Sequence, residues 1–211
     1  MSGNRTIAGW IAYLDLYAFS ADLTDEQLGQ TTRSLSFLYK RASQLTRHVQ
    51  SLVNFRAFSD TMVLWVKHDE FSQDGLNVML DLLSNIVDIA AELGFIFRGA
   101  VSFGDIIVSS NFVLGDAYLR AYKLAEFGII DPIIVIPKSE IERSCILYKD
   151  SYQYEEIVLK KDQRESVIQV PSPSWEAAER IARKYSSRSS DSQADVWGRL
   201  LARSASVKGA Q

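Results

Sequence analysis

The 211-residue chain carries a formal net charge of −3, with 47% hydrophobic residues and one cysteine, Cys145. This length suits one ample domain, or one domain with a helical appendage, that can bury a full core. The charge gives no indication of nucleic-acid or membrane binding, and a lone cysteine excludes a disulfide framework and favours a reducing compartment. Because residues 1–10 lack a signal-peptide apolar region and no apolar run has membrane length, we expect a cytoplasmic protein.

The first predicted elements alternate between strand and helix. Residues 7–14 are apolar and strand-like, and residues 24–50 keep a helical period of apolar side chains. Residues 52–58 and 61–67 are rich in β-forming side chains. The two residues between them, 59–60, predict a tight hairpin.

A second helix and further strands follow. Residues 77–94 form an amphipathic pattern that ends on Gly94, a suitable residue just past a helix C-terminus. Residues 95–109 read as a pair of strands interrupted by Gly104, and residues 115–128 as a helix bracketed by glycines.

The last part of the chain changes in character. Residues 132–137 predict a buried strand between prolines, and residues 155–170 a terminal hairpin. We expect one main domain over residues 1–172, then a helical extension over residues 173–211 with a serine-rich linker. The order β-α-β-β-α-β, followed by more helix and strand, predicts an α+β fold with helices against an antiparallel-rich sheet.

Two acidic residues stand where apolar strands end. Asp15 closes the first strand, and Asp60 lies in the predicted hairpin turn. In this element order the first strand and the hairpin can lie side by side, so the two carboxylates would meet. Such a pair repels unless it is protonated or bridged by a cation, and Mg²⁺ or Mn²⁺ suits oxygen ligands. The spacing alone leaves the alternative that Asp60 only supplies the turn and Asp15 caps a loop.

Three segments resemble motifs of the class III nucleotide cyclases. "LDLYAFS" is similar to their D-I-x-G-F-T segment, with Ala18 at the glycine, and "FRAFSDTMVL" to their K-x-x-G-D-x hairpin, with Ser59 at the glycine. "FRGAVSFGDIIVSSNFVLGDAYLRAYKLAE" resembles the segment R-x-G-I-H-x-G followed by G-x-x-V-N-x-A-x-R-L-E. The motifs occur in the family's order over roughly residues 10–126, and they imply its ferredoxin-like palm core.

The resemblance implies a homodimeric enzyme in which two divalent cations, Mg²⁺ or Mn²⁺, hold a nucleoside triphosphate. The ribose 3′-hydroxyl attacks the α-phosphate and expels pyrophosphate. Asp15 and Asp60 match the metal ligands, and Leu16 adjoins them at the metal site. Arg98 matches the family arginine on the phosphate chain, unless it is a surface strand arginine. The implied phosphate-binding residues are Tyr17, Ala18, Phe19, Ser20 and Arg98.

The two positions at which adenylate and guanylate cyclases read the purine hold Arg56 and Phe112. Arginine only donates hydrogen bonds, so it suits oxygens of uracil or O2 and N3 of cytosine, but not the donor edges of adenine and guanine. Phe112 narrows the pocket and offers a stacking face. These departures favour the bacterial pyrimidine cyclases, which make cyclic UMP or cyclic CMP as an antiphage signal. UTP is the favoured substrate, with CTP possible, and a downstream effector would sense the product without binding the enzyme.

The third motif departs from the family at its transition-state asparagine and arginine, where Leu119 and Lys123 stand. Lys123, or the neighbouring Arg120, would supply a cation from the partner subunit. Lys160 and Lys161 are further candidates for reaching the γ-phosphate, with strand-edge protection as their alternative. Two other interpretations stay open: a purine cyclase, and a degenerate nucleotide-binding module that only dimerises.

Overall fold

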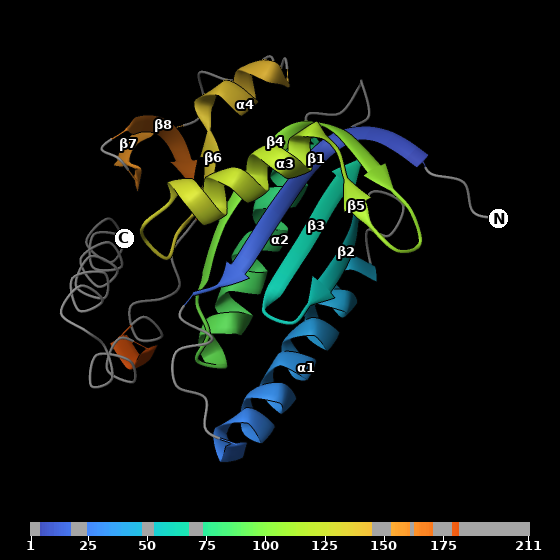
Figure 1. Ribbon diagram of the computed structural model, residues 1–211, viewed down its shortest axis with the longest axis vertical. Coiled ribbons are helices and arrows are strands. Elements are labelled where there is room, and N and C mark those ends of the chain that lie inside the picture. The colour runs from blue at the N-terminus through green and yellow to red at the C-terminus, as the bar shows by residue number, and fades with distance from the viewer. Residues whose placement is uncertain are drawn as a thin grey trace.

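A mixed β-sheet forms the centre of the fold (Figure 1). This computed structural model describes residues 5–17, 25–47, 53–67, 74–144, 153–160, 163–170 and 179–181. The strands in sheet order are β2 (Val53–Phe58), β3 (Thr61–Lys67), β1 (Arg5–Leu16), β4 (Phe97–Val108), β6 (Ile134–Pro137), β8 (Arg164–Gln169) and β7 (Glu155–Val158), and β5 (Val113–Leu114) pairs with β4.

The long strand β1 lies between β3 and β4 and is antiparallel to both. Within the sheet β4 and β6 form a parallel pair, whereas the other pairs are antiparallel. The predicted α+β fold with its β-α-β-β-α-β core is therefore confirmed. Its consequence for the site is that the C-terminal end of β1 adjoins the turn between β2 and β3.

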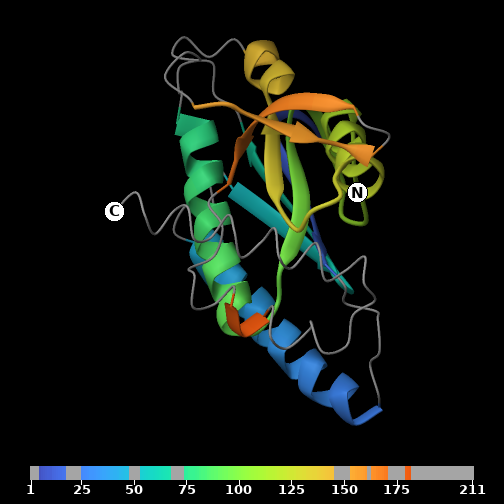
Figure 2. The same cartoon turned by 90° about the vertical axis from the view of Figure 1, so that its left-hand side faces the viewer.

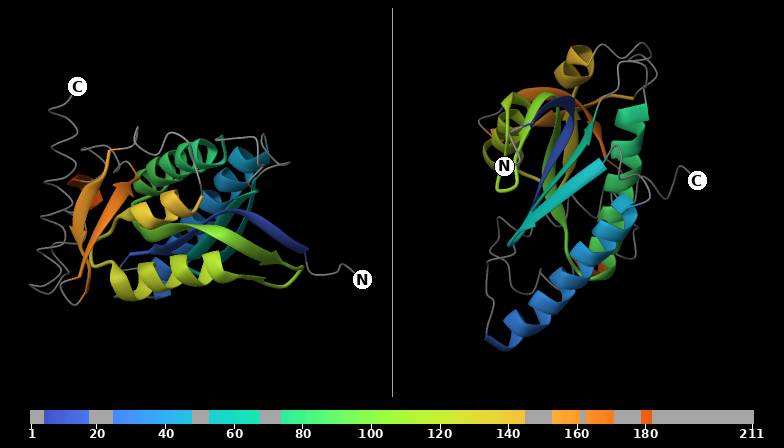
Figure 3. Two further views of the ribbon diagram at one scale, coloured as in Figure 1. Left: turned by 90° about the horizontal axis from the view of Figure 1, so that it is seen from above. Right: turned by 90° about the vertical axis from the view of Figure 1, so that its right-hand side faces the viewer.

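Helices cover both faces of this sheet (Figures 2 and 3). Helices α1 (Asp25–Arg47) and α2 (Asp74–Glu92) pack on one face, around a core that includes Trp10, Leu64 and Met79. Helix α3 (Asp116–Lys123) and the π-helix η1 (Leu124–Gly128) pack on the other, which we call the α3 face. Buried residues of the α3 face include Ile11, Val63 and Ala117. No helix in the described part of the chain is long and apolar enough to span a bilayer.

Two sequence predictions need correction. Residues 97–108 form one continuous strand, and not two, because Gly104 adopts a φ of 153° and keeps its pairing with Gly9. The predicted helix over residues 115–128 is α-helical only to Lys123, and a π-helical turn follows. In addition, a short helix that the sequence pattern did not indicate, α4 (Lys138–Arg143), follows β6.

The predicted hairpins and the C-terminal extension have different outcomes. Residues 59–60 do connect β2 to β3, and β7 pairs with β8 as the terminal hairpin. Of the predicted extension over residues 173–211, only residues 179–181 lie within the described part, so the domain boundary remains a prediction. Ile181 is buried, and with Arg180 it lines a small cavity at the C-terminal end of α2.

Candidate active site

Asp15 and Asp60 come together at one edge of the sheet. Asp15 is paired with Thr61, the residue after Asp60, in the register of β1 and β3. The backbone N–H of Leu16 donates to the carbonyl oxygen of Asp60 at 3.0 Å. Both acids are partly exposed; Asp15 lies in the β1 ladder, and Asp60 lies in the turn directly before the first residue of β3. The adjacency expected from the element order is thus present in the fold.

The electrostatic setting of Asp15 disfavours its charged form. Burial and, to a smaller extent, the nearby carboxylates of Glu126 and Asp60 together raise its pKa to about 6, against the opposing effect of Arg98. A carboxylate whose charged form is disfavoured in this way is stabilised by a cation that binds it directly. The sequence pattern predicted this repulsion between Asp15 and Asp60; the part played by Glu126 comes from the tertiary structure.

Arg98 lies between two acids on the α3 face. It is the register partner of Asp15 across β1 and β4, and its Nη2 donates to Asp15 Oδ2 at 3.0 Å. The same Nη2 lies 3.4 Å from Glu126 Oε2. Its Nε is buried and has no hydrogen-bond partner among the described residues. Arg98 is therefore not the surface strand arginine considered as an alternative, since its side chain is only 15% exposed.

The turn that carries Asp60 is anchored from helix α1. Ser59 adopts a φ of 54°, a left-handed conformation that is unusual for a residue with a side chain. The hydroxyl of Tyr39 donates to the carbonyl oxygen of Ser59. Burial and the Asp60 carboxylate raise the pKa of Tyr39 to about 12, so the hydroxyl stays protonated as a donor. Tyr39 thereby fixes the left-handed residue that replaces the expected glycine.

The residues expected to bind phosphates are only partly described. Leu16 is buried, and the N–H of Tyr17 donates to the Ile96 carbonyl at 2.8 Å, so this amide is already used within the fold. The remaining candidates, Ala18, Phe19 and Ser20, lie outside the described residues. Of the candidate phosphate-binding residues, Arg98 is therefore the one whose side chain can be placed at the site.

The two base-reading candidates meet at one loop. Arg56, on the edge strand β2, donates from Nη2 to the carbonyl oxygen of Ser109. The Oγ of Ser109 accepts the N–H of Phe112 at 3.1 Å, and the Ser109 N–H donates to the Phe112 carbonyl at 3.0 Å. Phe112 is exposed at 38%. Arg56 and Phe112, 56 positions apart in the numbering of the chain, thus belong to one local arrangement.

Arg120 and Lys123 have opposite surroundings on α3. All three guanidinium nitrogens of Arg120 are engaged: Nε with Glu140 at 2.7 Å, Nη1 with Asp116 at 2.6 Å, and Nη2 with the Phe103 carbonyl at 2.5 Å. These contacts hold α3 to β4 and α4, so the guanidinium of Arg120 is engaged within its own chain. Lys123 is exposed and has no hydrogen-bond or ion-pair partner within the described residues.

Glu126 is a member of the cluster that sequence reasoning missed. It lies in η1, where the N–H of Ile129 donates to the Leu124 carbonyl five residues earlier at 2.9 Å. This π-helical turn changes which side chains face the sheet, and it directs Glu126 toward Tyr13 and Arg98. The regular helical period over residues 115–128 predicted an uninterrupted helix, so it did not indicate that Glu126 points toward the site.

Two further residues surround this cluster. Tyr13 donates its hydroxyl to Glu126 Oε1 at 3.0 Å, and burial raises its pKa. Its ring makes edge contacts with the rings of Tyr118 and Tyr122, which stack on each other. Lys160, one of the two candidates for the γ-phosphate, donates to the carbonyl oxygen of Glu126 at 2.8 Å, and Lys161 lies outside the described residues. Lys160 therefore lies beside the cluster with its ammonium bound to η1.

The donor set at this edge can be tested against the implied cations. Asp15 and Asp60 supply hard carboxylate oxygens, which suit Mg²⁺ or Mn²⁺ that retain waters and bind phosphate oxygens. Within the described ranges no group of three or more His, Cys, Asp or Glu residues forms a complete cage. A two-carboxylate site fits cations whose remaining ligands come from a nucleotide, and it does not fit a structural metal held by protein alone.

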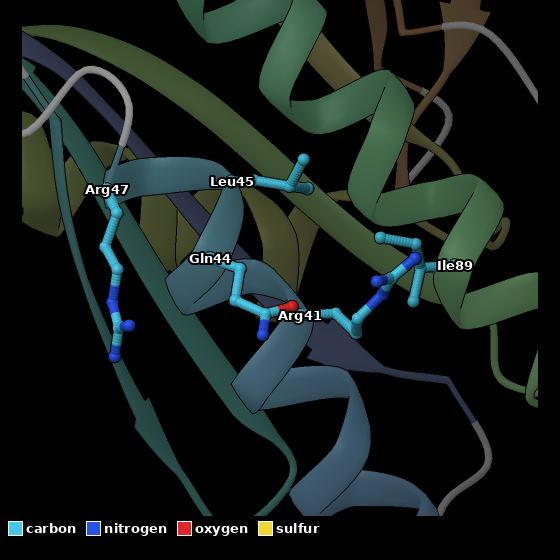
Figure 4. A pocket seen from close by; sticks show the side chains of 5 residues that line it. All are labelled: Arg41, Gln44, Leu45, Arg47 and Ile89. Carbon is cyan, nitrogen blue, oxygen red and sulfur yellow. The ribbon is translucent and has the colours of Figure 1, made fainter.

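A separate cavity of about 490 Å³ lies on the opposite face, between α1 and α2, and is lined by Arg41, Gln44, Leu45, Arg47 and Ile89 (Figure 4). Arg41 extends across the cavity toward α2, whereas Arg47 extends in a different direction, so their charges do not converge. Arg41 also lies over the ring of Phe37 at 5.9 Å. This cavity has no connection to the acidic edge in the described contacts.

Comparison with solved structures identifies the fold. The chain is similar to the dimeric guanylyl cyclase domain of the RhoGC fusion protein from Blastocladiella emersonii, with a TM-score of 0.59, 12% identity, and coverage of 81% of this chain and 99% of that one. The guanylate cyclase domain of RhGC from Catenaria anguillulae in complex with GTP gives a TM-score of 0.57 at 12% identity, covering 80% and 99%. The adenylyl cyclase CyaB from P. aeruginosa gives 0.55 at 14% identity, covering 81% and 96%.

These similarities show that the chain has the fold of class III nucleotidyl cyclase catalytic domains. At 10–14% identity they concern the fold alone. No protein-family model and no curated protein matches the sequence.

Proposed function

We propose that this protein is a metal-dependent nucleotidyl cyclase, which converts a nucleoside triphosphate to its 3′,5′-cyclic monophosphate and pyrophosphate. The observation that carries the proposal is the meeting of Asp15 and Asp60 at adjoining strand ends, with Arg98 beside them. The cyclase fold of the similar structures supports it. Asp15, whose pKa is raised by burial and by the neighbouring carboxylates of Glu126 and Asp60, is a ligand that a dication would stabilise in its charged form.

In this mechanism the protein positions charges. Divalent cations held by Asp15 and Asp60, with Leu16 adjoining, would neutralise the triphosphate and lower the pKa of the ribose 3′-hydroxyl. Arg98 would orient the phosphate chain, because its guanidinium lies beside Asp15 and its forked donors suit phosphate oxygens. The core of buried strands under these residues keeps them in place with little reorganisation, which is the main protein contribution to phosphoryl transfer.

We propose a homodimer in which each site takes a cation from the partner subunit. The exposed large apolar side chains of the described residues include Phe58, Phe112, Leu114 and Leu119, and a partner subunit would cover those that it contacts. Lys123 lies one turn from Leu119 on α3, and its free ammonium suits charge that develops on a phosphoryl group across such an interface. Arg120 is excluded from this role by its own contacts.

The favoured substrate is a pyrimidine nucleoside triphosphate, with UTP ahead of CTP. Support comes from the hydrogen-bond donors of Arg56 and from its link through Ser109 to Phe112. With one donor nitrogen bound to a backbone carbonyl, Arg56 keeps other N–H groups for the oxygens of uracil. The cyclic product would act as a signal in antiphage defence, read by a separate effector.

The test is incubation of the purified protein with each of the four nucleoside triphosphates and Mn²⁺, followed by product identification. We expect cyclic UMP as the main product, and none from the variant D60A. Cyclic AMP or cyclic GMP as the sole product would refute the pyrimidine assignment but keep the cyclase. Stabilisation by nucleotide without turnover would instead support the second candidate, a degenerate binding module, which the replacement of the transition-state asparagine by Leu119 favours.

A further inference from the structure

Glu126 is the second carboxylate bound to Arg98, and its placement is specified from three sides. Tyr13 donates to its Oε1 at 3.0 Å, Arg98 approaches its Oε2 at 3.4 Å, and Lys160 donates to its backbone carbonyl at 2.8 Å. Its side chain is 25% exposed, and the π-helical turn of η1 is what directs it inward. π-helical turns of this kind are frequent at functional sites.

Arg98 has one donor group shared between two acids. Its Nη2 is closer to Asp15, at 3.0 Å, than to Glu126, at 3.4 Å. Without a cation, the carboxylate of Asp15 is thus bound to Arg98. A dication that binds Asp15 has to displace this ion pair, and a buried guanidinium left without a carboxylate is costly. Glu126 is the acid within reach that can then take over the whole contact.

We propose that Glu126 is a positioning residue that holds Arg98 when Asp15 turns to a divalent cation. The inference rests on the proposed function, because it assigns Glu126 a part in the same site. Glu126 does not ligate the cation: Arg98 lies between it and Asp15, and its Oε1 is bound by Tyr13. It keeps the guanidinium beside the phosphate position, so that the cation and Arg98 can act together.

The test measures binding of Mn²⁺ alone, from the electron paramagnetic resonance signal of free Mn²⁺, to the full-length wild type and to variants. E126Q keeps the shape of the side chain but removes its charge, so Arg98 stays with Asp15. We expect the Mn²⁺ dissociation constant to rise about tenfold, the lower end for a residue that supports a metal ligand. The matched control is E142Q on the exposed end of α4, which should bind Mn²⁺ as the wild type does.

A double-mutant cycle with R98M separates positioning from simple charge. If Glu126 acts through Arg98, then E126Q in the R98M background weakens Mn²⁺ binding only about twofold, the size of a screened charge effect. Equal losses in the two backgrounds would mean that Glu126 acts by its own field or as a ligand, and would overturn the inference. Unchanged binding in E126Q alone would overturn it as well.

Two further variants complete the test. Y13F removes the hydroxyl donor to Glu126 without changing charge, and we expect about a threefold weaker Mn²⁺ affinity, a measurement that stays informative if E126Q folds poorly. D15N defines the site. If wild type and D15N bind Mn²⁺ equally, the cation site of the proposed function fails and the role of Glu126 falls with it. If only D15N loses Mn²⁺ and E126Q does not, the proposed function stands and this inference alone is wrong.

Discussion

Asp15 and Arg98 form an ion pair of 3.0 Å across neighbouring strands, directly beside the turn that carries Asp60. The two residues are partners in the β1–β4 register, so the sheet itself brings them together. Burial raises the pKa of Asp15 although Arg98 lowers it, and the buried Nε of Arg98 has no hydrogen-bond partner among the described residues. A bound cation would therefore stabilise the Asp15 carboxylate, and phosphate oxygens would stabilise the Arg98 guanidinium.

The first prediction concerns stability and pH. The pKa of Asp15 is raised from 3.8 to about 6 in the folded state, so its charge disfavours folding above pH 6. In metal-free buffer at about pH 7.5, D15N should raise the free energy of unfolding by about 2 kcal/mol. The gain should shrink as the pH falls through 6 and vanish below 4. Urea unfolding at several pH values, with chelator present, measures it; a destabilised D15N at neutral pH would contradict the raised pKa.

The second prediction concerns sharing of the site between subunits. Chains with D60A and chains with K123A should each lose most cyclase activity, by about 100-fold or more, because each lacks a charge that stabilises the transition state. Mixed heterodimers should recover up to one working site in each dimer. Co-expression with two affinity tags and product assay of the doubly purified species measures this. Absence of recovery would mean that sites are not shared, or that Lys123 has no part in them.

The third prediction tests the structural role of Arg120. Its partner Glu140 has a side chain only 4% exposed and also accepts the Phe103 N–H at 2.9 Å. R120M leaves this buried carboxylate with Arg143 at 3.6 Å, and should lower the free energy of unfolding by about 3 kcal/mol. The control R164M breaks an ion pair whose side chains are 68% and 60% exposed, and should cost less than about 1 kcal/mol. If R120M and R164M lowered the free energy of unfolding equally, the structural role assigned to Arg120 would be wrong.

The fourth prediction concerns the glycine after Arg98. A Cβ on Gly99 would lie 2.5 Å from the Tyr13 carbonyl oxygen and 2.7 Å from the Leu14 side chain, because β1 and β4 approach closely there. G99A should destabilise the fold by about 1–3 kcal/mol and separate Arg98 from Asp15. The control G29A adds a methyl to helix α1 with nothing within 4 Å, and should stabilise by about 1 kcal/mol. Thermal unfolding of both variants checks the opposite signs.

The sequence by itself determined the element order and the meeting of the two acids. Alternation of apolar residues predicted β1, β2 and β3. A two-residue connection allows the β2–β3 hairpin few registers. Asp60 in that turn therefore lies near the C-terminal end of β1, which pairs with β3. Arg56 and Phe112 were found by position in motifs that resemble a family. Such local signals depend on residues close in sequence, which is why they could be read without coordinates.

Only the tertiary structure decided how the side chains are used. The contact of Glu126 with Arg98, the engagement of Arg120 by Glu140, and the anchoring of Ser59 by Tyr39 all join residues 20 to 28 positions apart. Hydrogen-bond capacity is finite, and the three guanidinium nitrogens of Arg120 are all engaged by Glu140, Asp116 and the Phe103 carbonyl. Sequence shows which charges exist, but their pairing depends on which of them the packed sheet and helices place within 4 Å of one another.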